Sequence, residues 1–314
     1  MRNGVVIASI ATVCLSATPV LIAACGELLA ERVGIFNIGI EGSMLVGAFL
    51  AVVVARATGS ALLGVLAAMM AGCVGSLFFA IVVVLLRAEL VMAGLALYFV
   101  VAGITVGLGG SYVGKNVTAG LPVWDIPVLA HIPYVGPALF QQVSVTYLGF
   151  ALPVVIWFIL YRTRHGLNLR AIGESPATAD VAGIPVNRWR LVYTSVGGAF
   201  AGLGGAMLTL GIVGSWEPNV TAGEGWLAMI IVIFASWRPF RLIGGALLFG
   251  GLSVLGSLAE AYGWGLPSEL LSAMPYIGTF GGVCILGWLR VRQAGWPPWP
   301  AALGEPFFRG SKGL

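Results

Sequence analysis

Two polar residues four positions apart offer the clearest hydrogen-bonding chemistry in this sequence. Asn37 and Glu41 lie in the stretch VGIFNIGIEGSMLVGAF, residues 33–49, whose other residues are mostly apolar or small. Because residues four apart share one helical face, both side chains would point the same way. Asparagine donates and accepts hydrogen bonds, and an ionised glutamate accepts them. The pair could contact a polar molecule, or it could form an interhelical hydrogen bond that fixes an interrupted helix.

A second segment echoes this motif. IGIEG at 38–42 opens one apolar segment, and AGEG at 222–225 opens another. Glycines around the two motifs loosen a helix and expose backbone amides. The two spans are predicted to run in opposite directions, and inverted repeats with interrupted helices around a central site are common in transporters. We therefore expect the translocation pathway to be lined by Phe36, Asn37, Glu41 and Glu224.

The stretch 162–190 is a long polar interruption between apolar segments. It carries five of the sixteen basic residues: Arg162, Arg164, Arg170, Arg188 and Arg190. Basic loops of membrane proteins stay on the cytoplasmic side. Within it, Ser175 suits a helix cap and Pro176 a first helical turn, which predicts a short helix to Ala182 that Gly183 ends. This pattern is typical of a docking element for a soluble partner.

The composition places these motifs in a membrane. Charged residues make up 9% and hydrophobic residues 59% of the chain, and the mean hydropathy is +1.00. Soluble domains average roughly 25% charged and 45–50% apolar residues. Long apolar runs favour helices over a barrel. We expect an all-α integral membrane protein, a polytopic bundle of about 8–10 spans. Candidate spans are 4–25, 36–55, 60–86, 91–110, 144–161, 191–213, 224–237, 242–260 and 270–289.

The organisation follows from these spans. Residues 1–314 are expected to form a single transmembrane domain. The loop 111–143 should lie outside, the loop 162–190 inside, and the tail 290–314 inside in an extended form. The charged stretch Gly26–Glu41 is the expected site of a broken or re-entrant helix near residues 26–42, since irregular or charged backbone at membrane depth must be packed in protein or line a cavity.

Several kinds of chemistry find no support. The sequence has no metal-ligating set and no nucleophile–base pair within the spans, so we expect neither metal, cofactor nor enzyme activity. Basic residues are not interleaved with aromatic ones as in nucleic-acid sites, so no nucleic-acid partner is expected. Gly109 to Lys115 nearly spells a phosphate-binding loop, but Asn116 replaces the Ser or Thr that would hold magnesium. ATP would have to be hydrolysed by another chain.

A family resemblance extends over nearly the whole chain, in order. It rests on residues 33–49 with the upstream Glu27, Glu31 and Arg32, and on four later segments: 166–174 with 182–184, 195–206, 221–226 and 237–239. Together these segments resemble the permease subunits of bacterial ABC importers for simple sugars and, more closely, purine nucleosides, a branched-chain amino acid permease-like family. Glu224 departs from the pattern, because the family usually has an aromatic or basic residue after Ala222-Gly223.

The resemblance implies a multi-pass permease subunit of the bacterial inner membrane. It would pair with a second, non-identical permease, two ABC ATPase subunits and an external substrate-binding lipoprotein. Asn37 and Glu41 would then contact ribose hydroxyls or a purine edge only weakly. The coupling loop would meet the ATPase through Arg170, Gly173, Glu174, Ser175, Pro176 and Gly183.

Three alternatives remain open from the sequence. The cargo could be a simple sugar in place of a purine nucleoside. The chain could be an ion-coupled secondary transporter that uses Glu41 and Glu224 as coupling carboxylates. It could also be a membrane scaffold whose 162–190 loop only recruits a partner.

Overall fold

The computed structural model describes residues 2–117, 119–127, 130, 135–291 and 299–308. These residues form helices and one small antiparallel sheet, in which β1 (Val123–Asp125) pairs with β2 (Gln141–Val143). The sheet and the short α5 (Val135–Leu139) lie in the segment that was predicted to be an external loop. The expected all-α class is confirmed, since the sheet lies between the long helices α4 and α6 and does not interrupt them.

Nine helices correspond to the nine segments predicted from the sequence. They are α1 (Arg2–Arg32), α2 (Ile40–Thr58), α3 (Ala61–Ala80) with the π-helical η1 (Ile81–Leu85), α4 (Leu90–Gly109), α6 (Ser144–Arg162), α9 (Val186–Ala206) with the π-helical η3 (Met207–Val213), α10 (Glu224–Phe234), α11 (Pro239–Ala261) and α12 (Ser268–Val291). Among the described residues, seven helices are long and apolar enough to cross a membrane, whereas α10 has only 11 residues.

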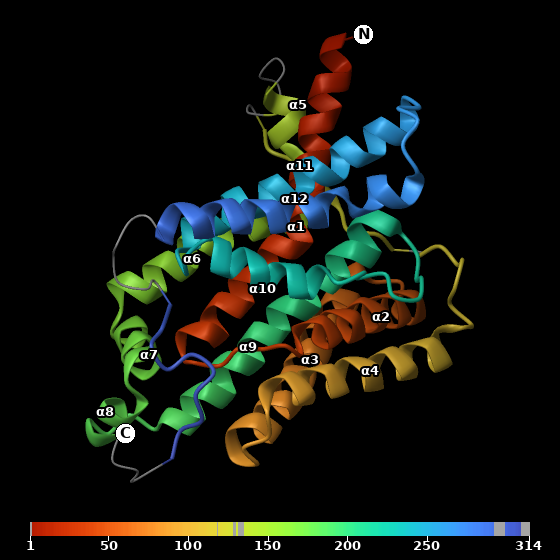
Figure 1. Cartoon of the computed structure of the whole chain (residues 1–314). Helices are drawn as coiled ribbons and strands as arrows, with labels where there is room; N and C mark the ends of the chain where they lie inside the picture. The colour runs from red at the N-terminus through yellow and green to blue at the C-terminus, as the bar shows by residue number, and fades with distance from the viewer. Residues whose placement is uncertain (1, 118, 128–129, 131–134, 292–298, 309–314) are drawn as a thin grey trace.

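The helix α1 forms the centre of the bundle. It packs against α9, α11, α10 and α6, while α9 also packs against α2 and α3 (Figure 1). Gly202 of α9 lies so close to α3 that a Cβ atom there would be 2.1 Å from the carbonyl oxygen of Ala68. Glycines at this crossing therefore let the backbones approach, as small residues do in membrane bundles.

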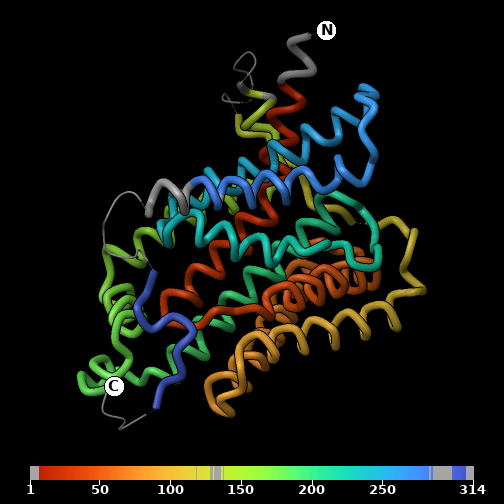
Figure 2. Tube along the Cα trace, viewed as in Figure 1, coloured from red at the N-terminus to blue at the C-terminus, as the bar shows by residue number. Residues whose placement is uncertain are grey.

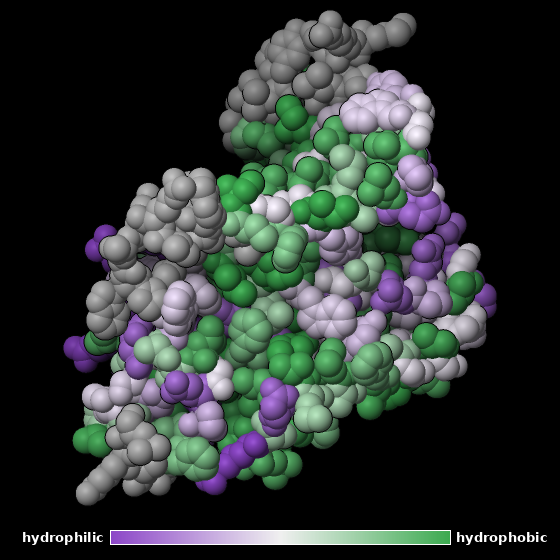
Figure 3. Space-filling model, viewed as in Figure 1, coloured by the Kyte–Doolittle hydropathy of each residue, from purple (hydrophilic) through white to green (hydrophobic). Residues whose placement is uncertain are grey.

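Several basic residues gather at one end of the bundle. One end, which we call the basic end, gathers Arg32, Arg87, Arg238 and the segment 162–190, which forms α7 (Arg164–Glu174) and α8 (Pro176–Val181). The opposite end holds the segment 110–143 and the connection between η3 and α10, which meet where the amide of Val117 donates to the carbonyl of Gly214. Hydrophilic residues gather over α7 and α8, and hydrophobic ones over α4 (Figure 3).

The interruption after α1 is shorter than predicted. The sequence placed a broken or re-entrant helix near residues 26–42, but α1 continues as a regular helix to Arg32, and only residues 33–39 break before α2. Two carboxylates can stay within α1 because each has a donor: Glu27 accepts from the amide of Asn37 at 2.9 Å, and Glu31 accepts from the indole of Trp237. These bonds tie a regular α1 to the break before α2 and to the connection after α10.

The C-terminal segment also differs from the extended tail that was predicted. Residues 299–308 pack against the basic end, where Ala302 is buried (Figure 2). The amide of Ala302 donates to the carbonyl of Gly173 at 2.9 Å, and that of Gly304 donates to the carbonyl of Gly34 at 3.0 Å. Within the predicted tail 290–314, residues 292–298 and 309–314 lie outside the described residues.

Candidate translocation site and coupling element

The starts of α2 and α10 meet inside the bundle. Glu41, in the first turn of α2, is fully buried. Its carboxylate accepts hydrogen bonds from the Thr221 hydroxyl at 2.6 Å, the Gly223 amide at 2.9 Å and the Gly225 amide at 2.7 Å. A carboxylate is favoured there because the amides at a helix N-terminus are unsatisfied and carry partial positive charge. The two echoing sequence motifs are therefore joined directly.

A tight turn brings these amides together. Ala222 and Gly223 both adopt positive φ values, 45° and 92°, which turn the chain into α10. A Cβ at Gly225 would be 2.7 Å from the Cα of Glu41, so the contact requires glycine. Two aromatic residues complete the junction: the Trp226 indole donates to the carbonyl of Ile38 at 3.1 Å, and the Tyr276 hydroxyl donates to that of Ala222 at 2.9 Å.

Asn37 is also fully buried and bonded within the protein. Its amide side chain donates to the hydroxyl of Ser76 at 3.2 Å, and Ser76 in turn lies 2.8 Å from the hydroxyl of Ser43. These bonds tie the break between α1 and α2 to α3. The sequence left two roles open for Asn37 and Glu41: lining the pathway, or forming interhelical hydrogen bonds. The hydrogen bonds that both residues make in the structure are interhelical. Phe36 is half-buried beside them.

Glu224 has different surroundings although it also lies in the first turn of its helix. It is half-buried, and among the described residues its Oε2 atom has no hydrogen-bond partner. It lies in the wall of a cavity of about 230 Å³ between α10, α11 and α12. Of the four predicted pathway residues, Glu224 is the one that borders this cavity.

The sequence reasoning missed several residues of this region. Thr221, Gly225 and Tyr276 hold the junction, and Ser253 and Ser257 line the cavity. The serines carried a usable signal, since they lie four apart in an otherwise apolar helix and must share one face. The junction partners carried no such signal, because nothing local says that residue 41 meets residues 221–225.

The segment 162–190 forms a compact pair of helices at the basic end. Thr163 caps α7 by accepting from the Gly166 amide at 3.1 Å, and Ser175 caps α8 by accepting from the Thr178 amide at 3.3 Å. Pro176 opens α8, as its sequence position predicted. Gly183, with φ +85°, follows the helix, and its amide donates to the Asp180 carbonyl at 3.0 Å.

The predicted coupling residues divide into supporting and exposed ones. Gly173 is buried against the end of α1, where a Cβ atom would be 2.4 Å from the carbonyl oxygen of Arg32. Glu174 and Gly183 are exposed, and Arg170, Ser175 and Pro176 are half-buried. The Arg170 guanidinium lies over the ring of Tyr161 at 5.2 Å. The element therefore rests rigidly on α1 while part of its surface stays open.

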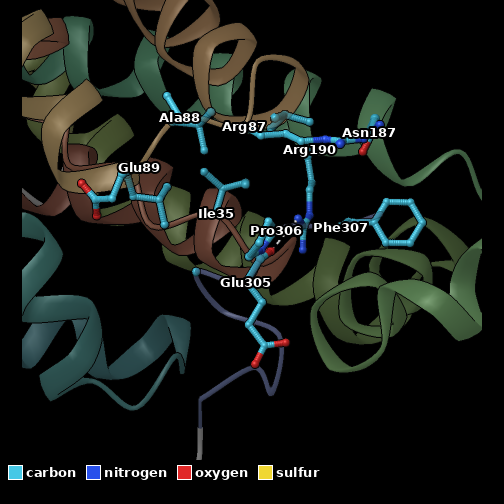
Figure 4. A pocket seen from close by; sticks show the side chains of 13 residues that line it. Ile35, Arg87, Ala88, Glu89, Asn187, Arg190, Glu305, Pro306 and Phe307 are labelled. Atoms are coloured by element: carbon cyan, nitrogen blue, oxygen red, sulfur yellow. Dashed lines mark hydrogen bonds between the residues drawn. The ribbon is translucent and has the colours of Figure 1, made fainter. Parts of the chain in front are cut away.

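Arg190 connects three segments at the basic end: α9, the break after α1 and the C-terminal segment. Only 2% of it is exposed; its Nε donates to the carbonyl of Val33 at 3.1 Å and its Nη1 to that of Glu305 at 3.0 Å. Figure 4 shows Arg190 and Arg87 in the wall of a pocket of about 270 Å³, with Glu305 and Phe307 contributed by the C-terminal segment. Glu89 lies in the same wall, and the Met92 and Val91 amides lower its pKa by donating to its carboxylate. The described wall of this pocket thus contains two basic and two acidic residues.

Comparisons with known proteins agree with this architecture. The family model described as "Branched-chain amino acid transport system / permease component" matches residues 9–278. The guanosine ABC transporter permease protein NupQ of Bacillus subtilis is 33% identical over 310 residues, covering 94% of this chain and 95% of its own. The nucleoside ABC transporter permease protein NupC of Lactococcus lactis is 31% identical over 283 residues, covering 86% and 89%.

A third relative is named for a sugar. A chain of Haloferax volcanii, described provisionally as a glucose ABC transporter permease protein, TsgC13, is 39% identical over 244 residues, covering 76% of this chain and 74% of its own. No solved structure gives a significant match. These findings confirm the resemblance to ABC permeases, which are non-catalytic membrane subunits. The chain therefore belongs to the family of branched-chain amino acid transport system permease components, as a multi-pass ABC permease subunit of the plasma membrane.

Proposed function

We propose that this permease imports a purine nucleoside or related nucleobase compound, driven by ATP hydrolysis on two partner ATPases that dock on α7 and α8. The observation that carries the docking is the exposure of Val181, which is 90% exposed at the end of α8. A large apolar side chain offered to water on a polar, capped element is typical of a protein contact. Gly173, buried against Arg32, would pass a displacement of α7 directly to α1.

The cargo assignment rests on the share of this chain that aligns with each relative. NupQ, named for guanosine, aligns with 94% of this chain, whereas TsgC13 aligns with 76% at higher identity. Glucose-type sugars are therefore the second candidate cargo. Two guanosine permeases of one organism, NupQ and NupP, both match this chain, at 33% and 26% identity. This supports a second, non-identical permease as partner, together with an external substrate-binding lipoprotein that confers affinity.

The test compares two exposed valines at opposite ends of the bundle. Val181→Asp should abolish co-purification of the ATPase and uptake of radiolabelled guanosine and adenosine in cells that express the complete transport system. Val123→Asp, at a residue 61% exposed at the start of β1, is the matched control and should keep ATPase binding. Glu174→Arg should act like Val181→Asp, because it reverses a charge on the same surface.

Two results would contradict the proposal. Uptake that survives Val181→Asp but stops when the ion gradient is collapsed would favour an ion-coupled transporter. Nucleoside uptake absent from the unmodified system, with glucose uptake present and ATPase-dependent, would move the cargo to sugars and leave the ATP-driven mechanism in place.

A further inference from the structure

The cavity beside Glu224 is lined by an unusual set of side chains for a membrane bundle. Its polar lining consists of two carboxylates and four hydroxyls, from Glu224, Ser253, Ser257, Glu260, Ser272 and Tyr276. No basic side chain belongs to this lining among the residues that the structure describes. Polar and ionisable residues inside a membrane are costly and usually mark a substrate or ion pathway.

The lining runs along the bundle. Ser253, Ser257 and Glu260 occupy one face of α11, since they are spaced by four and three residues. α11 begins at the basic end and leads away from it, so Glu260 lies near the opposite end while Glu224 lies at the junction inside the bundle. Glu260 and Ser257 are exposed, whereas Phe249 beneath them is buried. The cavity thus extends from the far end of the bundle to Glu224.

A second cavity adjoins the first. It has about 350 Å³, lies between α1 and α11, and shares Ser253 and Ser257 with the cavity beside Glu224. It adds three more hydroxyl residues, Ser9, Thr12 and Ser16, from α1. The two cavities meet along the serine face of α11, which gives a hydroxyl-lined space of the size that small ligands occupy, roughly 300–1,000 Å³.

The hydroxyls are available as acceptors. Ser253 donates to the carbonyl of Phe249 at 3.0 Å and Ser257 to that of Ser253 at 3.1 Å. These bonds satisfy both of these hydroxyl protons within the helix. The oxygen lone pairs of the two serines can still accept from a passing donor. Glu224 belongs to the same lining, although its unpartnered Oε2 atom is itself buried among the described residues.

We propose that this cavity is the passage for cargo on the outer side, and that its lining admits neutral, hydroxyl-rich molecules and rejects anions. Cargo hydroxyls donate to serine and carboxylate oxygens, and loosely held acceptors suit a passage better than a tight site. A cargo carboxylate or phosphate would meet Glu260 at the exposed end of the cavity and Glu224 at its inner end, where a lower dielectric constant strengthens the repulsion between like charges. Nucleosides and sugars would pass; free amino acids and nucleotides would not. Measuring this selection by uptake requires the proposed function to hold, whereas measuring it by chemical labelling of the cavity does not.

The experiment uses single cysteines in the complete transport system. Cys73 and Cys284, the two cysteines that are not buried, are first replaced by alanine. Ser253→Cys and Ser257→Cys are then treated with a positively charged aminoethyl or a negatively charged sulfonatoethyl methanethiosulfonate. Thr58→Cys is the matched control, because Thr58 is an exposed hydroxyl that donates to its own helix at 2.7 Å and lies outside the cavity.

We expect the cationic reagent to modify Cys at 253 and 257 about tenfold faster than the anionic one, because a cleft of one charge sign concentrates counter-ions. Modification should stop guanosine uptake, whereas modified Thr58→Cys should keep it. Adding Glu224→Gln and Glu260→Gln should bring the two rates close together. If the unmodified system carries neither nucleosides nor sugars, the proposed function fails. The ratio of the cationic to the anionic modification rate still tests whether the cavity selects against anions.

Equal rates for the two reagents in the variants that retain Glu224 and Glu260 would overturn the proposal. So would normal uptake after complete modification at residue 253. The double variant Ser253→Ala with Ser257→Ala is a second test, which introduces no thiol. Its uptake of nucleoside should fall, while co-purification of the ATPase stays unchanged.

Discussion

Glu41 and Glu224 occupy similar places in two interrupted helices, and their surroundings separate their roles. Each lies in the first turn of a helix that begins inside the bundle, next to glycine. Glu41 accepts from one hydroxyl and two amides, whereas the Oε2 atom of Glu224 is buried without a partner among the described residues, in a residue that borders a cavity. A carboxylate whose acceptor positions are filled holds neighbouring elements together, whereas an unpartnered carboxylate oxygen contributes no such bond. The following changes test this difference, and they begin with the largest expected effect.

Glu41→Ala should destabilise the protein most. Thr221, Gly223 and Gly225 would lose their acceptor in a water-poor interior, and each unsatisfied donor costs about 1–3 kcal/mol. We expect a total loss of about 3 kcal/mol or more. Thermal unfolding of the detergent-purified chain measures this. Glu224→Ala is the control and should change stability by less than about 1 kcal/mol; equal losses in both variants would erase the distinction.

Glu41→Gln and Glu224→Gln give a finer comparison of the same positions. Glutamine keeps one oxygen but places an NH₂ group against an amide donor, so Glu41→Gln should cost about 1–2 kcal/mol. At position 224 the same change should leave the unfolding temperature nearly unchanged. A Glu224→Gln variant that unfolds as early as Glu41→Gln would show that Glu224 also has a structural bond.

Ser76→Ala extends the test to the break that leads into α2. It removes the partner of the Asn37 side chain and of Ser43, and should cost about 1 kcal/mol, the typical net worth of a buried hydrogen bond. Ser195→Ala is the matched control, because Ser195 donates only to its own helix, at 2.7 Å to Leu191. No difference between the two serine variants would mean that the contact between α3 and the break adds no stability.

Glu89→Gln should have the smallest effect, and one that depends on pH. Glu89 caps α4 and accepts from the Met92 amide at 2.7 Å, which lowers its folded-state pKa. A lowered folded-state pKa means that Glu89 adds stability above its unfolded pKa, about 4.3. That contribution is lost as the pH falls through the folded value. The unmodified chain and Glu89→Gln should therefore differ at pH 7 and converge in acid; a constant difference across pH would contradict this.

The sequence predicts the positions of helices better than the contacts between them. Apolar runs located all nine segments, and the residues Ser175, Pro176 and Gly183 located α8 because capping chemistry is local. The role of Glu41 depends on donors 180 or more residues away, which no local pattern reveals. For the same reason, the end of α1 was placed too early: Glu27 and Glu31 look unfit for a helix in a membrane until Asn37 and Trp237 are seen beside them.

The packing of residues 299–308 has a consequence for the order in which the protein is made. Arg190 and the break at Gly34 leave the ribosome long before the segment that supplies the Glu305 carbonyl and the Gly304 amide. Until that segment arrives, the guanidinium of Arg190 has, of its two bonds to described residues, the one to Val33 alone. The basic end of the bundle is therefore completed late in biosynthesis, and a ribosome stalled before residue 299 would hold a chain whose α1, α7 and α9 are inserted but not yet joined at that end.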